Sequence, residues 1–391
     1  MENELEIAKR FVEWLSSGKI FPYLLEIRLT DRCNLKCLTC WQRAWDGIDR
    51  DFKEISIETW MRVIKEAKKM GVVGIEITGG GEPLIRLEEC VKIMKLVKEL
   101  NMKGSLVTNG TLFTESSLKE IVKMGWDKIH FSIDGHTPEI NDFLRGVNGA
   151  FEKAVEAIRK LNFWKKKLGK DAPRIVLMPV VTNVNYDKLD GLLELAHQLE
   201  VPEVIFQGMV VHSDIGKKLE LTEKQKEELL SRIPSFMEKA KELGIKTNLE
   251  SFLPYTPTPN DKGSRSPSSV IKLPLCILPW YYVGIRADGS VKPCPIDSPD
   301  RDWPSIINSS LEEIIYGEVF QEIRKMLIEQ KVPSSCSHCC PNVIGRNNKI
   351  KKGVEKYIKL ILENFGKIEN FVRRGDFESI NLIFQRIERE M

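Results

Sequence analysis

The chain has 391 residues, of which 42% are hydrophobic and 29% charged, a composition typical of a soluble globular protein. Its 59 basic and 56 acidic residues nearly balance, so charge alone does not suggest a nucleic-acid partner. No window reaches the roughly 20 apolar residues that a membrane helix needs, and no signal peptide is recognisable at the start. We therefore expect a cytoplasmic protein without a membrane span.

Short apolar runs alternate with amphipathic stretches over residues 24–208, which predicts parallel strands joined by helices. Residues 1–23 are expected to form a helical segment before them. The expected strands are 24–29, 73–78, 104–108, 128–133, 174–181 and 204–207, and the expected helices are 57–70, 87–100, 115–124, 150–161 and 188–199. These units number about six, fewer than the eight of a complete barrel. We therefore predict an α/β fold with a partial, TIM-like (β/α)6 barrel over residues 24–250.

The second half of the chain predicts three further segments. After a helix at 223–243, residues 251–275 are expected to be a linker or mobile loop, because 254–272 are rich in Pro, Ser, Thr, Asn and Asp. Residues 276–345 hold five cysteines and are expected to form a small domain with hairpin strands at 280–286 and 291–294. Residues 346–391 alternate apolar and charged residues at helical spacing, which predicts C-terminal helices.

The nine cysteines gather at the two ends of the chain, a distribution that favours metal ligation over disulfides. Cys33, Cys37 and Cys40 follow the first expected strand and can ligate three irons of a [4Fe-4S] cube, leaving the fourth iron open. Zinc is the alternative, but it normally requires four ligands, and no fourth lies near this triplet. Cys90 stands apart within a helical pattern and is expected to be a buried structural thiol.

The next strand ends carry glycine and small polar residues. Gly79, Gly80 and Gly81 precede Glu82 and Pro83, and consecutive glycines can aim main-chain groups at a polar ligand. Asn109 closes the third expected strand, while Ser132 and Asp134 close the fourth. In parallel barrels this carboxyl edge holds the active site.

The spacing Cys33-x3-Cys37-x2-Cys40 after a first strand, followed by the Gly-Gly-Glu-Pro run after the second, resembles the signature of the radical S-adenosylmethionine (SAM) enzymes. The resemblance implies that Gly80, Gly81 and Glu82 bind the amino group of SAM. It further implies that Ser132 and Asp134 contact the ribose and methionyl part, and that Arg145 pairs with the carboxylate. An aromatic residue commonly precedes the last cysteine in this family, whereas Thr39 does here; Trp41 could stack on the adenine or pack in the core.

The second group comprises Cys276, Cys294, Cys336, Cys339 and Cys340, and by itself fits either a [4Fe-4S] cube or zinc. Its spacing resembles the twitch extension, a shorter relative of the SPASM domain, and this implies an auxiliary [4Fe-4S] cluster. The implied ligands are Cys276, Cys294, Cys336 and Cys339, with Cys340 a spare or an alternative to Cys339. A full SPASM domain carries seven cysteines, so five do not support a second auxiliary cluster.

The resemblance implies a radical SAM oxidoreductase or maturase that cleaves SAM reductively to a 5′-deoxyadenosyl radical and abstracts hydrogen from its substrate. The leading expectation is oxidation of a small polar molecule with the help of the auxiliary cluster. The alternative is a peptide or protein maturase, and a third possibility is a non-catalytic metal-binding scaffold. The expected partners are a small-molecule or peptide substrate and a reductant such as ferredoxin or flavodoxin.

Overall fold

The computed structural model describes residues 4–19, 22–45, 53–253, 273–296, 302–336, 339, 341–374 and 376–390. Most of the predicted linker, residues 254–272, lies outside the described residues, and so does Cys340. None of the helices in these ranges is long and apolar enough to cross a membrane.

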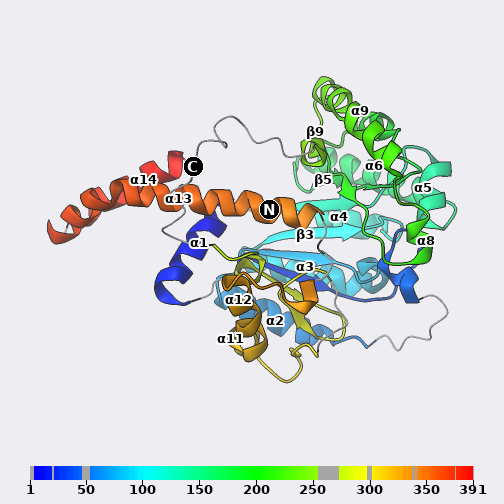
Figure 1. The fold of residues 1–391 in the computed structure, drawn as a ribbon. Helices are drawn as coiled ribbons and strands as arrows, with labels where there is room; N and C mark the ends of the chain where they lie inside the picture. The colour runs from blue at the N-terminus through cyan, green and yellow to red at the C-terminus, as the bar shows by residue number, and fades with distance from the viewer. Residues whose placement is uncertain are drawn as a thin grey trace.

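A nine-stranded sheet forms the centre of the described chain, in the order β11-β10-β1-β2-β3-β4-β5-β7-β9 (Figure 1). All of its neighbouring strands are parallel except β10 and β11, as the partial barrel requires. Its strands are β1 (Leu24–Arg28), β2 (Gly74–Thr78), β3 (Lys103–Thr108), β4 (Lys128–Phe131), β5 (Arg174–Leu177), β7 (Glu203–Val204), β9 (Lys246–Thr247), β10 (Tyr282–Ile285) and β11 (Val291–Lys292). Within the described ranges the sheet stays open, with β11 and β9 at its edges.

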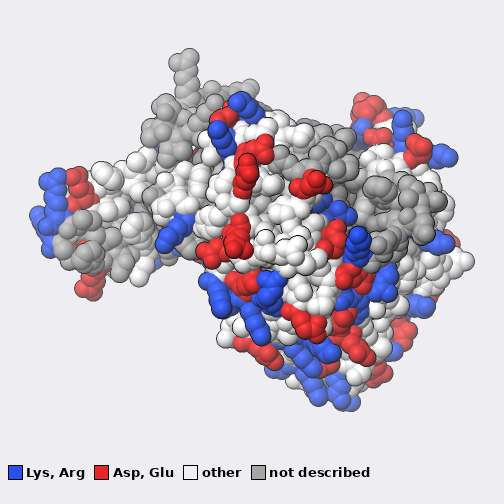
Figure 2. Space-filling model, turned by 90° about the horizontal axis from the view of Figure 1, so that it is seen from below, with Lys and Arg blue, Asp and Glu red and all other residues white. Residues whose placement is uncertain are grey.

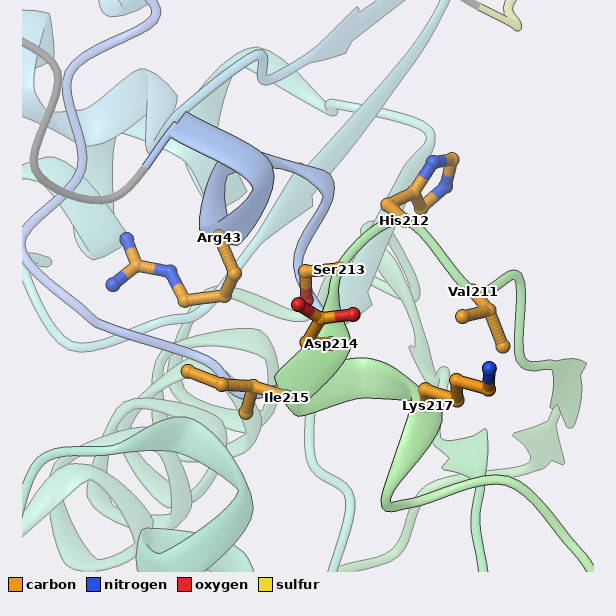
Figure 3. A pocket seen from close by; sticks show the side chains of 7 residues that line it. All are labelled: Arg43, Val211, His212, Ser213, Asp214, Ile215 and Lys217. Carbon is orange, nitrogen blue, oxygen red and sulfur yellow. The ribbon is translucent and has the colours of Figure 1, made fainter.

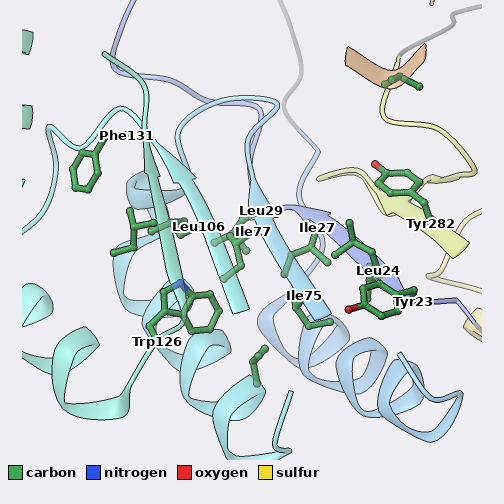
Figure 4. Packing of buried hydrophobic residues seen from close by; sticks show 14 of the residues in the cluster. Tyr23, Leu24, Ile27, Leu29, Ile75, Ile77, Leu106, Trp126, Phe131 and Tyr282 are labelled. Atoms are coloured by element: carbon green, nitrogen blue, oxygen red, sulfur yellow. The ribbon is translucent and has the colours of Figure 1, made fainter. Parts of the chain in front are cut away.

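Helices pack against the apolar face of this sheet, as the βα alternation predicted. They are α2 (Ile57–Lys69), α3 (Leu87–Glu99), α4 (Glu115–Met124), α6 (Ala150–Leu168), α7 (Leu189–Gln198) and α9 (Glu223–Glu242). A further helix, α5 (Pro138–Arg145), was not predicted and contacts α6. Ile27, Ile77 and Leu106 are in register on this face and are fully buried (Figure 4). Cys90 is fully buried in α3, which confirms the prediction of a structural thiol.

The other face of the sheet is polar. Glu26, Glu76, Ser105 and Lys128 pair in register across β1 to β4, one residue away from the apolar row. Because successive side chains of a strand point to opposite faces, these four lie on the face away from the helices. The partial barrel thus has a polar interior below the carboxyl ends of its strands.

Several predicted boundaries were wrong, for identifiable reasons. The strand expected at 174–181 is divided into β5 and β6 (Val180–Val181), because Pro179 cannot donate to a ladder. The strand expected at 204–207 is also divided, into β7 and β8 (Gln207–Gly208). β6 and β8 pair with each other in a separate two-stranded sheet. The helix expected to end at 161 continues to Leu168, where Gly169 caps it in the left-handed conformation.

The second half of the chain departs further from its prediction. The strand expected at 280–286 begins with a helical turn, α10 (Leu278–Tyr281), and only then becomes β10. β10 pairs in parallel with β1, so the predicted hairpin extends the barrel sheet. Between β11 and the last cysteines lie α11 (Leu311–Tyr316) and α12 (Glu318–Ile328).

The ends of the chain pack together. α1 (Glu4–Ser17) is the helix expected at the N-terminus, and it contacts the long C-terminal helix α13 (Pro341–Arg374). α14 (Phe377–Glu390) folds back on α13, and the two project together beyond the α/β body (Figure 1).

Candidate active site

The loop with the first three cysteines leaves the carboxyl end of β1 and rests on the glycines after β2. The backbone N–H of Gly81 donates to the Thr30 carbonyl at 2.9 Å. A Cβ atom on Gly80 would lie 1.5 Å from Asp31 Oδ1, and one on Gly81 would lie 1.9 Å from the Arg32 carbonyl oxygen. Glycine is therefore required here because the loop passes directly over the strand end.

The end of α5 holds the same loop from its other side. The backbone N–H of Lys36 donates to the Arg145 carbonyl at 3.2 Å, and that of Leu38 donates to the Leu144 carbonyl at 2.9 Å. Gly146 ends the helix with φ of 69°, and a Cβ atom there would lie 2.3 Å from the Lys36 carbonyl oxygen. The cysteine loop is thus fixed by backbone contacts from β2 and α5.

The three thiols lie close enough to influence one another. Burial raises the pKa of Cys33 to about 12 and also raises that of Cys40, and Cys37 raises both further. The backbone N–H groups of Leu35 and Gln42 donate to the Cys33 and Cys40 sulfurs at 3.5 and 3.4 Å. Such donors favour thiolate, the form that ligates iron.

In the parts of the chain that the structure describes, no three Cys, His, Asp or Glu side chains are arranged to hold a single metal ion. Zinc requires its ligands around one point, whereas a cube spreads three thiolates over three irons.

Arg145 lies between the cysteine loop and Asp134. Its Nη1 donates to Cys37 Sγ at 3.7 Å, and its Nε lies 2.9 Å from Asp134 Oδ2. Both residues are buried, and Arg145 Nη2 has no hydrogen-bond partner within the described ranges. A buried guanidinium with an unused donor fits an anionic ligand group such as a carboxylate.

Asp134 has protein partners for both of its carboxylate oxygens. Oδ2 pairs with Arg145, and Oδ1 accepts from the Val180 backbone N–H at 2.8 Å. Ser132 follows β4 directly and is half-buried; its backbone N–H donates to the Thr108 carbonyl. The structure therefore brings Asp134 to Arg145, while the predicted contacts of Asp134 and Ser132 with the ribose stay predictions.

Glu82 is buried beneath the same loop. Its carboxylate accepts from Thr108 Oγ1 at 2.6 Å and from the backbone N–H groups of Asn109 and Leu84 at 2.7 and 3.1 Å. Burial nevertheless raises its pKa to about 6, because these bonds only partly offset the loss of water. A carboxylate held in this way attracts a cationic group such as an ammonium.

Gln42 was not singled out in the sequence. Its Nε2 donates to the Asp31 carbonyl at 2.7 Å and to the Gly80 carbonyl at 2.5 Å, which ties the cysteine loop to the glycine turn. Its position two residues after Cys40 was the only available signal. Trp41 beside it starts the short helix η1 (Trp41–Trp45) and is half-buried.

The structure also brings the C-terminal cysteines together. Burial raises the pKa of Cys276 to about 11 and that of Cys294 further, and Cys336 and Cys339 contribute to both shifts. Cys276 and Cys294 each accept a backbone hydrogen bond from the residue two positions on, the pattern that Cys33 and Cys40 show. Four thiols from separate elements therefore lie near one another.

Comparisons with known proteins agree with both cysteine groups. Residues 27–196 match the radical SAM superfamily, and residues 276–340 match SPASM, an iron-sulfur cluster-binding domain. The chain belongs to the radical SAM superfamily. It is a radical SAM enzyme with a SPASM-type C-terminal domain, and its cofactors are SAM and two [4Fe-4S] clusters.

Two curated relatives are informative. The tungsten-containing aldehyde ferredoxin oxidoreductase cofactor-modifying protein of Pyrococcus furiosus is 28% identical over 195 residues, which are 48% of this chain and 51% of the relative. The chain thus matches only about half the length of that protein. The PqqA peptide cyclase of Ruegeria pomeroyi is 26% identical over 328 residues, 81% of this chain and 79% of the relative.

Two solved structures share the fold. SuiB of Streptococcus suis bound to S-adenosylmethionine has a TM-score of 0.63 and 18% identity over 81% of this chain and 71% of that chain. anSMEcpe with bound AdoMet has a TM-score of 0.59 and 20% identity over 90% of this chain and 100% of that chain. The partial barrel with its C-terminal extension is therefore a known arrangement.

One side chain joins the radical SAM domain to the SPASM-type domain. Arg28, on the polar face of β1, donates from Nε to Glu26 at 3.0 Å and from Nη2 to the carbonyl of Pro295, which follows Cys294. The phenol of Tyr282 is buried beside Glu26 and Cys294. The polar interior of the barrel thus reaches the C-terminal cysteine site.

A cavity of about 510 Å³ opens beside the cysteine loop of the radical SAM domain (Figure 3). It lies between η1 and the short helix α8 (Asp214–Lys217), and its lining is Arg43, Val211, His212, Ser213, Asp214, Ile215 and Lys217. The backbone N–H of Arg43 donates to the Cys40 carbonyl at 3.0 Å, so this cavity directly adjoins the cysteine loop.

Proposed function

We propose that this radical SAM enzyme modifies a peptide or protein substrate. The observation that carries the proposal is the match to the PqqA peptide cyclase, because it covers 81% of this chain and 79% of that relative. The fold agrees with a peptide substrate. The structure of SuiB bound to the precursor peptide SuiA matches this chain with a TM-score of 0.61.

The sequence placed oxidation of a small polar molecule before peptide modification. These relatives favour the second reading, because the peptide cyclase covers more of the chain than the cofactor-modifying protein does. A peptide can enter an open barrel without a closed pocket, and the sheet of this protein is open in the described ranges.

We assign the cluster ligands as the sequence predicted them. Cys33, Cys37 and Cys40 hold the cube with the open iron, because backbone contacts fix their loop and their thiols interact. Cys276, Cys294, Cys336 and Cys339 hold the auxiliary cluster, and the assignment of Cys339 over Cys340 rests on spacing alone.

The remaining residues of this site bind and orient SAM. Arg145 directs Nη2 to the cofactor's carboxylate, while Glu82 and the turn at Gly80 and Gly81 receive its ammonium group. Once bound, the cluster and SAM together supply a 5′-deoxyadenosyl radical. The chain positions the substrate hydrogen next to it and keeps water out.

Coexpression with any short open reading frame found beside the gene tests this function. We expect mass spectrometry to find a peptide that has lost a pair of hydrogen atoms, with wild-type enzyme and with the Cys90→Ala control. The Cys37→Ala variant should leave the peptide unchanged. Unmodified peptides, together with SAM-dependent oxidation of a small alcohol by the purified enzyme, would favour the small-molecule reading instead.

A further inference from the structure

Glu54 holds the chain that leads into the first cysteine loop. Its carboxylate accepts from Arg32 Nε and Nη2, both at 2.9 Å, and from the Thr30 hydroxyl. The two bonds from Arg32 form a bidentate pair, which fixes the geometry of a guanidinium and a carboxylate more closely than a single bond does. Both donors come from the short stretch that directly precedes Cys33.

The Thr30 hydroxyl connects Glu54 to the backbone of this stretch. Its Oγ1 donates to the Glu54 carboxylate and accepts from the Arg32 backbone N–H at 3.0 Å. Thr30 is fully buried, so a bond lost here would leave a polar group without water. Arg32, the residue directly before Cys33, is therefore held through its side chain and through its backbone N–H.

Glu54 is itself held in place by contacts from two domains. Arg86 Nη1 lies 3.8 Å from the Glu54 carboxylate, and both Nη atoms of Arg86 donate to the Ile55 carbonyl at 3.3 Å. The Ile55 backbone N–H donates to the carbonyl of Ala287, in the SPASM-type domain, at 2.8 Å. Mixed charges cover the face seen in Figure 2, whereas this carboxylate is mostly buried, with 15% of its side chain exposed.

Glu54 and α5 hold opposite ends of the cysteine loop. α5 binds the loop backbone at Lys36 and Leu38, around the second cysteine. Glu54 instead binds the residues that precede Cys33. The orientation of a cube, and with it the position of the open iron, depends on all three cysteines. A shift of Cys33 alone would therefore change where the open iron lies.

We propose that Glu54 is a positioning residue for the SAM-binding cluster. By holding Thr30 and Arg32, it sets where Cys33 presents its sulfur and so how the open iron faces SAM. Partners outside the ligand set commonly orient metal ligands in this way. The inference rests on the assignment of the first three cysteines to this cluster.

Electron paramagnetic resonance of the reduced holoenzyme tests this role, because only the cluster with an open iron should change its signal when SAM is added. Glu54→Gln keeps the size of the side chain, but it removes the charge and turns an N–H donor toward those of Arg32. We expect the SAM-sensitive signal to fall about twofold or more, while the auxiliary signal stays unchanged. The matched control is Glu66→Gln, because Glu66 also accepts from an arginine, Arg62, at 2.6 Å and from a backbone N–H at 3.0 Å, but near the C-terminal end of α2.

A second pair of variants tests the same contact without a change of charge. Thr30→Ser keeps the hydroxyl and should keep the SAM-sensitive signal, whereas Thr30→Val removes the hydroxyl and should lose signal as Glu54→Gln does. A full wild-type signal in Glu54→Gln or Thr30→Val would overturn the positioning role, and so would an equal loss in Thr30→Ser or Glu66→Gln. A wild type whose signal does not respond to SAM would overturn the ligand assignment and the inference with it.

Discussion

Buried polar side chains hold the two cysteine sites in place, and Arg28 links β1 of the radical SAM domain to the residue after Cys294. Its guanidinium forks between Glu26 and the Pro295 carbonyl, next to Cys294. A lysine would keep the charge beside Glu26 but has no planar fork to reach both acceptors. Arg28 is thus a positioning residue for the auxiliary site.

We expect Arg28→Lys to lower the iron bound at the auxiliary site and to alter its electron paramagnetic resonance signal, while the SAM-binding cluster keeps its own. The matched control is Arg62→Lys, because Arg62 also donates to a backbone carbonyl, that of Ile306, but away from the cysteines. An unchanged auxiliary signal in Arg28→Lys would contradict the positioning role.

His130 makes the stability of the fold depend on pH. Burial, with Lys128 nearby, lowers its pKa to about 3, so the folded chain resists a proton that the unfolded chain accepts near pH 6.5. The neutral His130 costs no stability above about pH 6.5, and the free energy of unfolding falls as the pH drops from there toward 3. At pH 5 this loss is about 2 kcal/mol.

Replacing His130 by Phe should remove this acid sensitivity. The free energy of unfolding of the apoprotein, measured with denaturant at pH 7 and pH 5, should fall less between the two pH values in His130→Phe than in the wild type. Parallel losses in the two proteins would show that the His130 imidazole does not titrate as its burial requires.

Among the individual site residues, those that belong to a sequence motif or a characteristic spacing could be predicted from the sequence. Cys33, Cys37 and Cys40 follow from their spacing, and the glycines before Glu82 from their place after a strand. Gln42 and Arg28 could not be found in this way, because Gln42 bonds to Asp31 and Gly80, and Arg28 to Pro295, over at least 11 residues, and only the folded chain brings them together.

The cysteine loop packs closely on the end of α5. Two glycines after α5 allow the effect of this close packing to be distinguished from the effect of backbone strain. Gly146 and Gly149 both have positive φ, at 69° and 79°. A Cβ atom on Gly146 would strike the Lys36 carbonyl, whereas one on Gly149 would meet nothing within 4 Å.

We therefore expect Gly149→Ala to cost only about 1–2 kcal/mol of stability, the penalty of a left-handed alanine. Gly146→Ala should carry the same penalty and, in addition, displace the cysteine loop and reduce iron binding at the first site. Iron analysis after anaerobic reconstitution compares the two, and equal iron in both variants would contradict the contact.

Helices and strands of the first half were well predicted because each repeats its apolar pattern several times. α4, for example, begins at Glu115 and ends at Met124 as expected, with Thr114 as its cap. Short elements with proline were not: Pro179 divides one strand, and Pro279 lies in the helical turn α10 where a strand was expected.

Over the whole molecule, the main surprise is that the C-terminal hairpin joins the barrel sheet beside β1. A pairing between strands more than 250 residues apart leaves no local signal, since periodicity describes one element at a time. This pairing places the auxiliary cysteines next to the polar interior of the barrel.

Because the two clusters have separate ligands, removing the ligands of one cluster should remove a defined share of the bound iron. We expect wild-type enzyme to bind about eight irons per chain and Cys276→Ala/Cys294→Ala to bind about four. Cys90→Ala should keep the wild-type content, because that thiol is buried in α3. A double variant that still binds the full content would contradict the assigned ligands.

Cys33, Cys37 and Cys40 are expected to hold the cluster that cleaves SAM. The most direct test is the amount of 5′-deoxyadenosine formed from SAM by anaerobically reconstituted enzyme with dithionite. We expect the wild type to form 5′-deoxyadenosine and Cys37→Ala to form none. A wild type with full iron content that forms none, or a Cys37→Ala variant that forms as much, would contradict it.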